Sequence, residues 1–491
     1  MKNKKKISVI SKKIVADFLT PVSAYNSFRD DRYSFLLESV EKGKAGRYSF
    51  IGLSPRSVYE IYYDRIRVLE RTGTGFEPGG EIKTSDPLSE IYTIMEGYEI
   101  SETSDLPPLC GGFVGYLSYE IIASWEKLKF ENPSDLGLPL GVFIFTDELI
   151  AFDHLYNTAD IIKLAIDDGD ETDDVYSMAG KSIEAIIDKL SRTPEPVRLF
   201  SLERGKRLEF DSNFSEDEFN ERVRKIKEEI VKGEIIQGVF SQRLTAVSRA
   251  DSFNYYRALR IINPSPYMFY LKLDNIVLCG SSPEVLVKVT GDEAVVRPIA
   301  GTRPRGKTEE EEKSLAEDLK SDIKERAEHI MLVDLGRNDL GKVCRYGTVK
   351  VKNLMSIEKY SHVIHMVTDV AGTLREDVNC IDVLKACFPA GTVSGAPKIR
   401  AIEIIEKNEN IRRGPYAGAV GYFSFTGDMD MCITIRTMLV YEGHVYVQAG
   451  AGIVADSVPE REYQETLNKA RALLEAVQLG ERIDDKEKIN D

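Results

Sequence analysis

Two groups of acidic residues are spaced so that their carboxylates fall on one face of a predicted helix. Glu325 and Glu328 lie three residues apart, and Glu462 and Glu465 repeat that spacing, with Lys469 four residues further on. Residues three and four apart are neighbours on a helix surface. If two such faces met, their oxygens could bind Mg²⁺, with water and a substrate carboxylate completing its shell. A solvated charged surface explains such runs more often, so spacing alone leaves both interpretations open.

A single histidine and a glycine-rich segment are chemically capable but have ordinary structural explanations. His365 alternates with apolar residues as in a strand, where a lone histidine is more often a satisfied core residue than an acid or base. QAGAGIVA, from Gln448, fits a dinucleotide-binding glycine pattern, but too little chain follows for the βαβ unit that this site needs. Its glycines are better explained by close approach to a ligand carboxylate or by a tight turn.

The helices that must position these residues begin with recognisable caps. Ser215 and Glu218 form a capping box, and Thr308 and Glu311 repeat it at the start of a long helix predicted to run to Leu335. A proline in the first turn marks a last helix over about 459–479. Strand-like runs such as GVFIFTDELIAFDH, NIVLCGSS and HVYVQAGAG are mixed with these helices without regular βαβ alternation. The pattern predicts an α+β protein.

The length and composition predict more than one structural unit. A chain of 491 residues exceeds the usual size of one compact core, so two or three units are expected. The composition changes most between 166 and 212, where IDDGDETDD indicates a solvated loop and SRTPEPV a linker. We therefore place a boundary near residue 195, between ranges 1–195 and 196–491.

The charge balance excludes some partners. The 65 basic and 80 acidic residues give a formal charge of −15, which disfavours non-specific binding to nucleic acid or to an anionic membrane. The six cysteines are scattered without a CxxC pair, as in a protein of a reducing compartment. No apolar stretch of signal-peptide length follows the basic start, so a cytoplasmic location is expected.

Eight segments of the second half resemble, in the same order, the chorismate-utilising enzymes. They are GSSPE (280–284), RPIAGTRPRG (297–306), ERAEHIMLVDLGRNDLGKV (325–343), HMVTDVAGTL (365–374), FPAGTVSGAPKIRAIEIIE (388–406), GPYAGAVGYF (414–423), DMCITIRT (430–437) and QAGAGIVADSVPEREYQETLNKA (448–470). This family includes anthranilate synthase component I, aminodeoxychorismate synthase, isochorismate synthase and salicylate synthase. The resemblance implies a large core of antiparallel sheets stacked at a steep angle and flanked by helices, with the β-rich N-terminal part integrated into it.

The resemblance assigns roles to the acidic groups. It implies that Glu328 and Glu465 bind Mg²⁺, the expected cofactor, with Glu325 and Glu462 beside them. It also implies that Glu284 protonates the hydroxyl group that leaves chorismate, for which its carboxyl must be protonated at rest.

The remaining site residues are implied in the same way. His365 would assist the loss of pyruvate. An arginine suits a substrate carboxylate because its planar fork binds both oxygens. The residues implied to hold chorismate are Gly301, Thr302, Thr392, Tyr416, Arg436, Gly450, Gly452 and Lys469.

Two positions select the branch of the family. Isochorismate and salicylate synthases carry a water-activating lysine where this chain has Gln237, and bacterial aminodeoxychorismate synthases carry a nucleophilic lysine where it has Ala300. The absence of both favours the anthranilate synthase branch, in which ammonia is the nucleophile. An aminodeoxychorismate synthase that lacks the lysine, and a catalytically silent tryptophan-sensing member, remain the alternatives.

No cysteine lies in a GxCxG elbow, so a separate glutamine amidotransferase subunit is the expected ammonia source. The expected assembly is a heterotetramer of two large and two small subunits.

The N-terminal part carries a second resemblance. TPVSAY (20–25), SFLLESVEKGKAGRYSFIG (34–52) and NPSPYMFY (263–270) are similar to the tryptophan feedback site of anthranilate synthase. The range 1–195 is thus the expected regulatory region, and 196–491 the expected chorismate-binding catalytic region. The residues implied to bind tryptophan are Glu38, Ser39, Pro266, Tyr267 and Met268.

Overall fold

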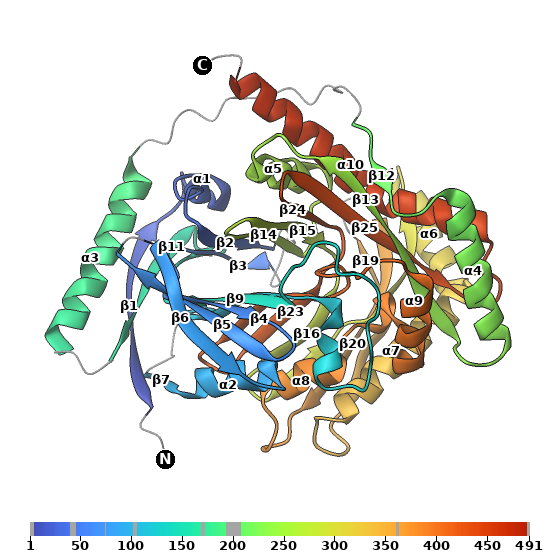
Figure 1. Cartoon of the computed structure of the whole chain (residues 1–491), viewed down its shortest axis with the longest axis horizontal. Coiled ribbons are helices and arrows are strands. Elements are labelled where there is room, and N and C mark those ends of the chain that lie inside the picture. Colours follow the sequence, from blue (N-terminus) through green and yellow to red (C-terminus); the bar gives the residue numbers. More distant parts are fainter. Residues whose placement is uncertain are drawn as a thin grey trace.

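The computed structural model of the chain combines two large sheets with helices at their faces and ends (Figure 1). It describes residues 4–39, 46–73, 75–101, 106–167, 172–192, 208–359 and 363–488. The boundary predicted near residue 195 lies outside these ranges.

The larger sheet contains strands from both halves of the chain. Its neighbours pair antiparallel, except that β7 lies parallel to β1, and the short β21 pairs with β13. In spatial order it runs β12 (Asp211–Ser212), β13 (Gln237–Val247), β25 (His444–Ile453), β24 (Thr437–Tyr441), β15 (Ile276–Ser282), β14 (Tyr267–Leu273), β2 (Tyr33–Glu38), β3 (Tyr48–Gly52), β10 (Glu148–Asp153), β11 (Thr158–Ile166), β1 (Lys5–Val15) and β7 (Tyr98–Ser101), with β21 at Gly395–Ala396.

The second sheet is antiparallel throughout and also joins the two halves, because β22 pairs with β8. Its order is β18 (Ile299–Pro304), β20 (Val363–Thr373), β17 (Glu293–Val296), β16 (Val285–Thr290), β23 (Met429–Ile433), β22 (Ala419–Ser424), β8 (Gly112–Leu117), β9 (Gly141–Thr146), β4 (Ser57–Ile61), β5 (Arg65–Thr72) and β6 (Gly75–Lys83), with β19 (Lys350–Lys359) beside β20. The ranges 1–195 and 196–491 therefore share both sheets.

The helices lie around the sheets. The long α10 packs on β25 and against α4 and α5, and α3 packs on β11 at the opposite side of Figure 1. They are α1 (Pro21–Asn26), α2 (Pro87–Glu96), α3 (Thr172–Ser191), α4 (Glu216–Val231), α5 (Ser252–Ile262), α6 (Glu309–Ser321), α7 (Ile323–Gly341), α8 (Cys380–Cys387), α9 (Lys398–Asn408) and α10 (Pro459–Lys488), with the short 3₁₀ helices η2 (Tyr119–Ser124) and η3 (Gly391–Val393).

The largest apolar core joins side chains from both sheets, and a second core lies beneath α5 and α10. Strand β2 belongs to both because its side chains alternate between its faces. Phe35 packs in the core between the sheets, whereas Leu36 packs in the core under the helices. Glu38 therefore points the same way as Leu36, towards α5.

The predicted helices are present, with two corrections. The capping box of Ser215 and Glu218 is formed at α4. The single helix predicted from Thr308 to Leu335 is instead two helices, because Asp322 ends α6 and its side chain accepts hydrogen bonds from the backbone N–H groups of α7. The last helix continues to Lys488, beyond the predicted end near 479. QAGAGIVA lies on β25 rather than on a strand-to-helix turn, which removes the dinucleotide interpretation.

Candidate functional site

Glu284 and Arg436 lie where the chain passes from one sheet to the other. Glu284 joins β15 to β16, and Arg436 joins β23 to β24, so each connects strands of different sheets. The two crossings are tied together, because Ser281 N–H donates to the Arg436 carbonyl and Ile433 N–H to the Glu284 carbonyl, both at 3.0 Å. Arg436 has a φ of 50°, an uncommon left-handed conformation for a residue with a side chain. Both functional groups are thus positioned by the junction of the two sheets.

Glu284 has the properties of a proton donor. Its side chain is buried, and Thr392 Oγ1 in η3 donates to Glu284 Oε1 at 3.1 Å. Burial raises the pKa of Glu284 to about 8, while the Thr392 hydrogen bond and the charge of Lys469 oppose this rise. The carboxyl group is therefore mostly protonated at neutral pH.

His365 lies on β20 opposite Thr302 of β18. Its Nδ1 contacts the Gly301 carbonyl at 3.0 Å and Thr302 Oγ1 at 3.2 Å. Gly301 occupies an irregularity of the β18 ladder with a φ of 70°, which glycine adopts without strain. Burial lowers the pKa of His365, and the charge of Arg436 lowers it further. The ring is neutral at neutral pH, and because a carbonyl only accepts, we assign the proton to Nδ1, which leaves the lone pair on Nε2.

A further group of predicted substrate residues consists of Tyr416, Gly450 and Lys469. A Cβ placed on Gly450 would lie 2.9 Å from the Tyr416 hydroxyl, so only glycine leaves this hydroxyl in place. Lys469 Nζ donates to the Gly450 carbonyl at 3.0 Å and forms an ion pair of 2.8 Å with Glu465. Burial raises the pKa of Tyr416 to about 12, so its hydroxyl remains a hydrogen-bond donor.

Gln237 lies beside Glu328, one of the acidic residues of α7. Its Nε2 makes a long hydrogen bond of 3.5 Å to Glu328, and a Cβ on Gly452 would approach this nitrogen to 2.5 Å. Among the described residues, no hydrogen-bond partner exists for the buried Gln237 Oε1. An amide at this position can orient a ligand but cannot act as a base.

The carboxylates of α7 and α10 fit a hard divalent cation. Burial raises the pKa of Glu328, and the charge of Glu325 raises it further; burial and Glu465 act in the same way on Glu462. A cation would relieve this desolvation and like-charge repulsion. Within the described ranges, no group of three or more His, Cys, Asp or Glu side chains is assembled for a metal, so substrate and water would supply further ligands.

Two basic side chains, Lys469 and Arg436, interact with the groups described above. The charge of Lys469 acts on Glu284, Glu328 and Glu462, which come from the sheet junction and from both helices. The charge of Arg436 acts on His365 and on Tyr416. No carboxylate pairs with Arg436 among the described residues, so its guanidinium is suited to a carboxylate of a ligand. These charges place the predicted chorismate residues in one region, whereas the four carboxylates predicted for the metal do not form one group among the described residues.

A separate cavity of about 470 Å³ holds the five residues predicted to bind tryptophan, Glu38, Ser39, Pro266, Tyr267 and Met268. The carboxylate of Glu38 points to α5, where the Tyr256 hydroxyl donates to it and Arg260 pairs with it at 3.1 Å. The negative charge of Glu38 is therefore already paired within the protein.

Asp430 is a carboxylate of this cavity that the sequence analysis did not single out. It accepts from the Tyr267 hydroxyl at 2.9 Å and pairs with Lys288 at 2.7 Å. It lies inside the matching segment DMCITIRT, but only the fold brings it beside Tyr267, so the sequence held no signal for this role.

The cavity of about 470 Å³ borders the Glu284 region. Val285 and Arg297 line this cavity and also a smaller one of about 50 Å³, to which Glu284 and Thr392 contribute. A change in the shape of the larger cavity would therefore move residues of β16, the strand that begins next to Glu284.

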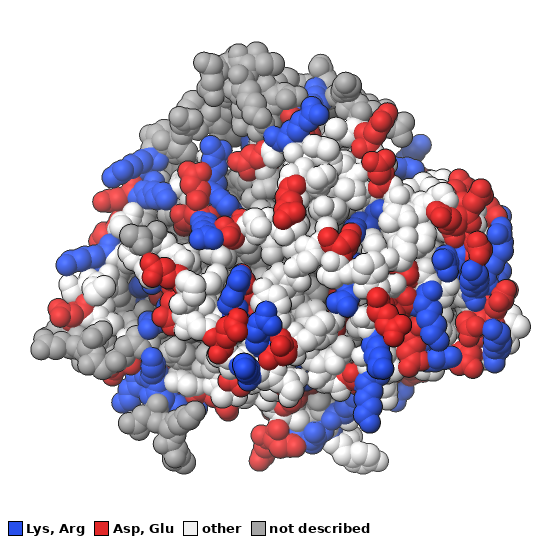
Figure 2. All heavy atoms as spheres, in the orientation of Figure 1, with Lys and Arg blue, Asp and Glu red and all other residues white. Residues whose placement is uncertain are grey.

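Charges of both signs are mixed on the face of the molecule seen in Figure 2. Figure 2 shows Lys and Arg interspersed with Asp and Glu over the viewed face, without a continuous basic area. None of the described helices combines the length and the hydrophobicity needed to cross a membrane.

The sheet junction that carries Arg436 is suited to bind an anionic substrate. The chain belongs to the family of chorismate binding enzymes, whose sequence profile matches residues 42–475. The resemblance seen in the eight segments is therefore confirmed.

The relatives and structures to which the chain is similar specify the branch. It is 47% identical over 475 residues to anthranilate synthase component 1 of Acetivibrio thermocellus, covering 96% of this chain and 95% of the relative. It is 44% identical to the protein of the same name from Thermus thermophilus, covering 96% and 98%. The crystal structure of anthranilate synthase component I from Streptococcus pneumoniae matches with a TM-score of 0.78 and 34% identity over 94% of this chain and 99% of that one. These matches confirm the predicted α+β fold.

Proposed function

We propose that this chain is the chorismate-aminating component of an anthranilate synthase. In this reaction ammonia adds to C2 of chorismate while the C4 hydroxyl leaves as water. The aminated intermediate then loses its enolpyruvyl side chain as pyruvate and becomes the aromatic anthranilate. The relatives that carry this name match nearly the whole chain, which supports the proposal.

The observation that carries the proposal is the amide of Gln237 beside Glu328. In this place other family members have a lysine that activates water, and an amide has no basic lone pair to do so. Ala300, at the position of the second functional lysine, is buried and apolar. A site with neither amine depends on an external nucleophile, and ammonia needs no activating base once it is unprotonated.

Glu284 and His365 divide the proton transfers between them. The protonated carboxyl of Glu284 donates to the C4 hydroxyl as that bond breaks. The neutral His365 accepts the proton released at C2 as pyruvate leaves. Environments that separate the protonation states of two groups in this way are typical of paired acid and base catalysts.

Mg²⁺ would be held by Glu328 and Glu465, with Glu325 and Glu462 beside them. When bound, it would supply positive charge to the ring carboxylate of chorismate. Arg436 and Tyr416 orient the enolpyruvyl side chain from the opposite wall. Lys469, which bonds Gly450 and pairs with Glu465, links the two ends of the substrate.

Ammonia would come from a separate glutamine amidotransferase subunit. All six cysteines are buried, and burial raises the pKa of each thiol. Such thiols are poor nucleophiles, so this chain does not itself provide glutaminase chemistry. Two large and two small subunits are the proposed assembly.

Tryptophan would inhibit from the 470 Å³ cavity. Pro266, Tyr267 and Met268 would enclose the indole, and Ser39 would border it. Because Glu38 is paired with Arg260 and Asp430 with Lys288, nearby backbone carbonyls are the better acceptors for the ammonium group of the inhibitor.

Product identification with the purified chain, chorismate, Mg²⁺ and an ammonium salt tests the proposal. Anthranilate and pyruvate in equal amounts are expected. Accumulation of an aminated product that retains the enolpyruvyl group would instead identify an aminodeoxychorismate synthase. Absence of chorismate consumption, and so of any aminated product or pyruvate, would identify a silent tryptophan-sensing protein.

A further inference from the structure

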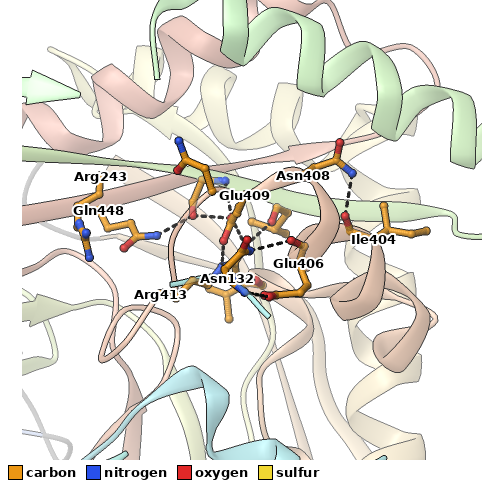
Figure 3. A network of polar contacts seen from close by, with 12 residues as sticks. Asn132, Arg243, Ile404, Glu406, Asn408, Glu409, Arg413 and Gln448 are labelled. Atoms are coloured by element: carbon orange, nitrogen blue, oxygen red, sulfur yellow. Dashed lines mark hydrogen bonds and ion pairs between the residues drawn. The ribbon is translucent and has the colours of Figure 1, made fainter. Parts of the chain in front are cut away.

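A buried arginine outside the residues assigned above holds three pieces of the site wall together (Figure 3). Arg413, 3% exposed, donates from Nε to Glu409 at 2.9 Å and from Nη2 to the same carboxylate at 2.7 Å. Its Nη1 donates to the Val393 carbonyl at 2.7 Å, and its Nη2 to the Val239 carbonyl at 2.6 Å. The fork of the guanidinium thus bonds two separate backbone segments and a carboxylate at once.

Each anchored segment carries a residue of the site. Val393 directly follows Thr392, the donor to Glu284. Val239 lies on β13 opposite Gly452. Arg413 itself precedes Tyr416 by three residues, and its guanidinium lies 5.7 Å from the centroid of the Tyr416 ring.

The network is fixed from both sides. Ser241 donates to Glu409 through its N–H at 3.0 Å and its hydroxyl at 2.7 Å, and Gln448 donates to that hydroxyl at 2.9 Å. On the other side, Glu120 of η2 accepts from the Arg413 N–H at 2.7 Å. The turn that presents Tyr416 is therefore held by its backbone as well as by its arginine side chain.

A purely stabilising role explains this arrangement less well. Replacing a buried ion pair by packed apolar residues is often neutral or stabilising, so stability alone gives little reason for such a pair. Here the two carbonyls that share the guanidinium belong to segments that line the substrate region. Errors of about 1 Å in substrate position can cost about 100-fold in rate.

We propose that Arg413, held by Glu409, is a positioning residue that sets the Tyr416 hydroxyl and the Thr392 segment at the spacing chorismate requires. This inference rests on the proposed function for its substrate. It adds a role that the matching segments do not assign, since Arg413 touches no substrate group itself.

The test is a double-mutant cycle in the full-length chain with Mg²⁺ and ammonium. Arg413→Lys keeps the charge beside Glu409 but loses the fork. It should lower kcat/KM for chorismate about 10- to 100-fold, through both KM and kcat, while the chain stays folded. In a background of Tyr416→Phe and Thr392→Val, the same change should cost less than about 3-fold, because the groups it positions are gone.

Two further variants complete the test. Arg413→Gln with Glu409→Gln leaves no lone buried charge, and should show the same loss in kcat/KM if Arg413→Lys does not fold. Lys163→Met breaks a partly buried ion pair of 2.9 Å with Asp147, remote from the site, and should lower Tm but change kcat/KM less than about 2-fold.

Two results would overturn the proposal. One is that kcat/KM per folded molecule is unchanged in the Arg413 variants while Tm falls, as in Lys163→Met. The other is that the full loss persists in the Tyr416→Phe/Thr392→Val background. Rates are followed as chorismate consumption, so the outcome stands apart from product identity, which tests the proposed function.

Discussion

Thr392 donates a hydrogen bond of 3.1 Å to the carboxyl of Glu284, which joins the 3₁₀ turn η3 to the crossing between the two sheets. The bond favours the ionised carboxyl and burial favours the protonated one, and burial dominates, so the pKa of Glu284 is about 8. The protonation state of the proposed acid is thus set by its position in the fold and adjusted by one hydroxyl.

The pH dependence of catalysis should follow from this balance. At a constant concentration of unprotonated ammonia, kcat/KM should fall above about pH 8 as Glu284 ionises. Thr392→Val removes an interaction that lowers the pKa, so the alkaline limb should move to higher pH. Glu284→Gln should reduce kcat by about 100-fold or more, since general acid catalysis contributes that much. An unchanged alkaline limb in Thr392→Val would contradict this account.

Stability should depend on the same carboxyl. Its pKa in the folded chain, about 8, lies above the ordinary value of 4.5, so the folded state binds more protons between these values. The free energy of unfolding should therefore decrease as pH rises from about 4.5 to 8. Glu284→Gln removes this loss, and at pH 8.5 it should be the more stable protein, by at most about 5 kcal/mol. Urea unfolding of both proteins at pH 5 and pH 8.5 measures the difference, and equal slopes with pH would refute it.

Removal of the metal ligands should abolish turnover without unfolding the chain. Glu328→Gln and Glu465→Gln should each reduce kcat/KM by at least about 100-fold, because several kcal/mol of charge stabilisation are lost. Calorimetric Mg²⁺ binding should weaken in both. Glu475→Gln, an exposed change on the same α10, is the matched control. Full activity in excess chelator would exclude the proposed metal role.

How much the sequence predicts depends on the range of the interactions. The capping box at Ser215 and the strand around His365 are local patterns, and both were predicted. The helix break at Asp322 was missed because neither glycine nor proline marks it, and the earlier box at Thr308 suggested one continuous helix. The orientation of Glu38 towards α5 depends on which face of β2 meets which core, which no local pattern gives.

The site shows the same limit. Spacing placed Glu328 and Glu465 on helix faces, and the prediction that the two faces meet came only from the family resemblance. Arg413 was not predicted because its partner Glu409 lies beyond the end of α9. Their spacing of four residues therefore does not place them on one helix face.

The nitrogen source should distinguish the isolated chain from its assembly. With ammonium the purified chain should form anthranilate, whereas glutamine alone should support no reaction, because none of the six buried thiols can act as a glutaminase nucleophile. Adding an amidotransferase subunit should restore glutamine-dependent activity. Glutamine use by the rigorously purified single chain would refute the separate-subunit proposal.

Tryptophan should inhibit from the cavity that contains Ser39, which borders the chorismate region without being part of it. For such inhibition it must bind an inactive arrangement better than the active one, since equal affinity would shift nothing. Val285 and Arg297 line both this cavity and the small one beside Glu284, which provides a physical connection. Ser39→Phe should fill part of the 470 Å³ and relieve inhibition with little change in uninhibited turnover.

A second variant distinguishes loss of tryptophan binding in the cavity from loss of the coupling between the cavity and the chorismate region. Reciprocity requires chorismate to weaken tryptophan binding by the same factor, typically about 5- to 150-fold. Asp430→Asn removes the carboxylate bonded to Tyr267 while leaving the cavity open, so it should weaken tryptophan binding without filling the space. Initial rates against tryptophan concentration, with calorimetric titration of the inhibitor, measure both effects. If Ser39→Phe binds and responds to tryptophan as the parent does, the inhibitor does not occupy this cavity.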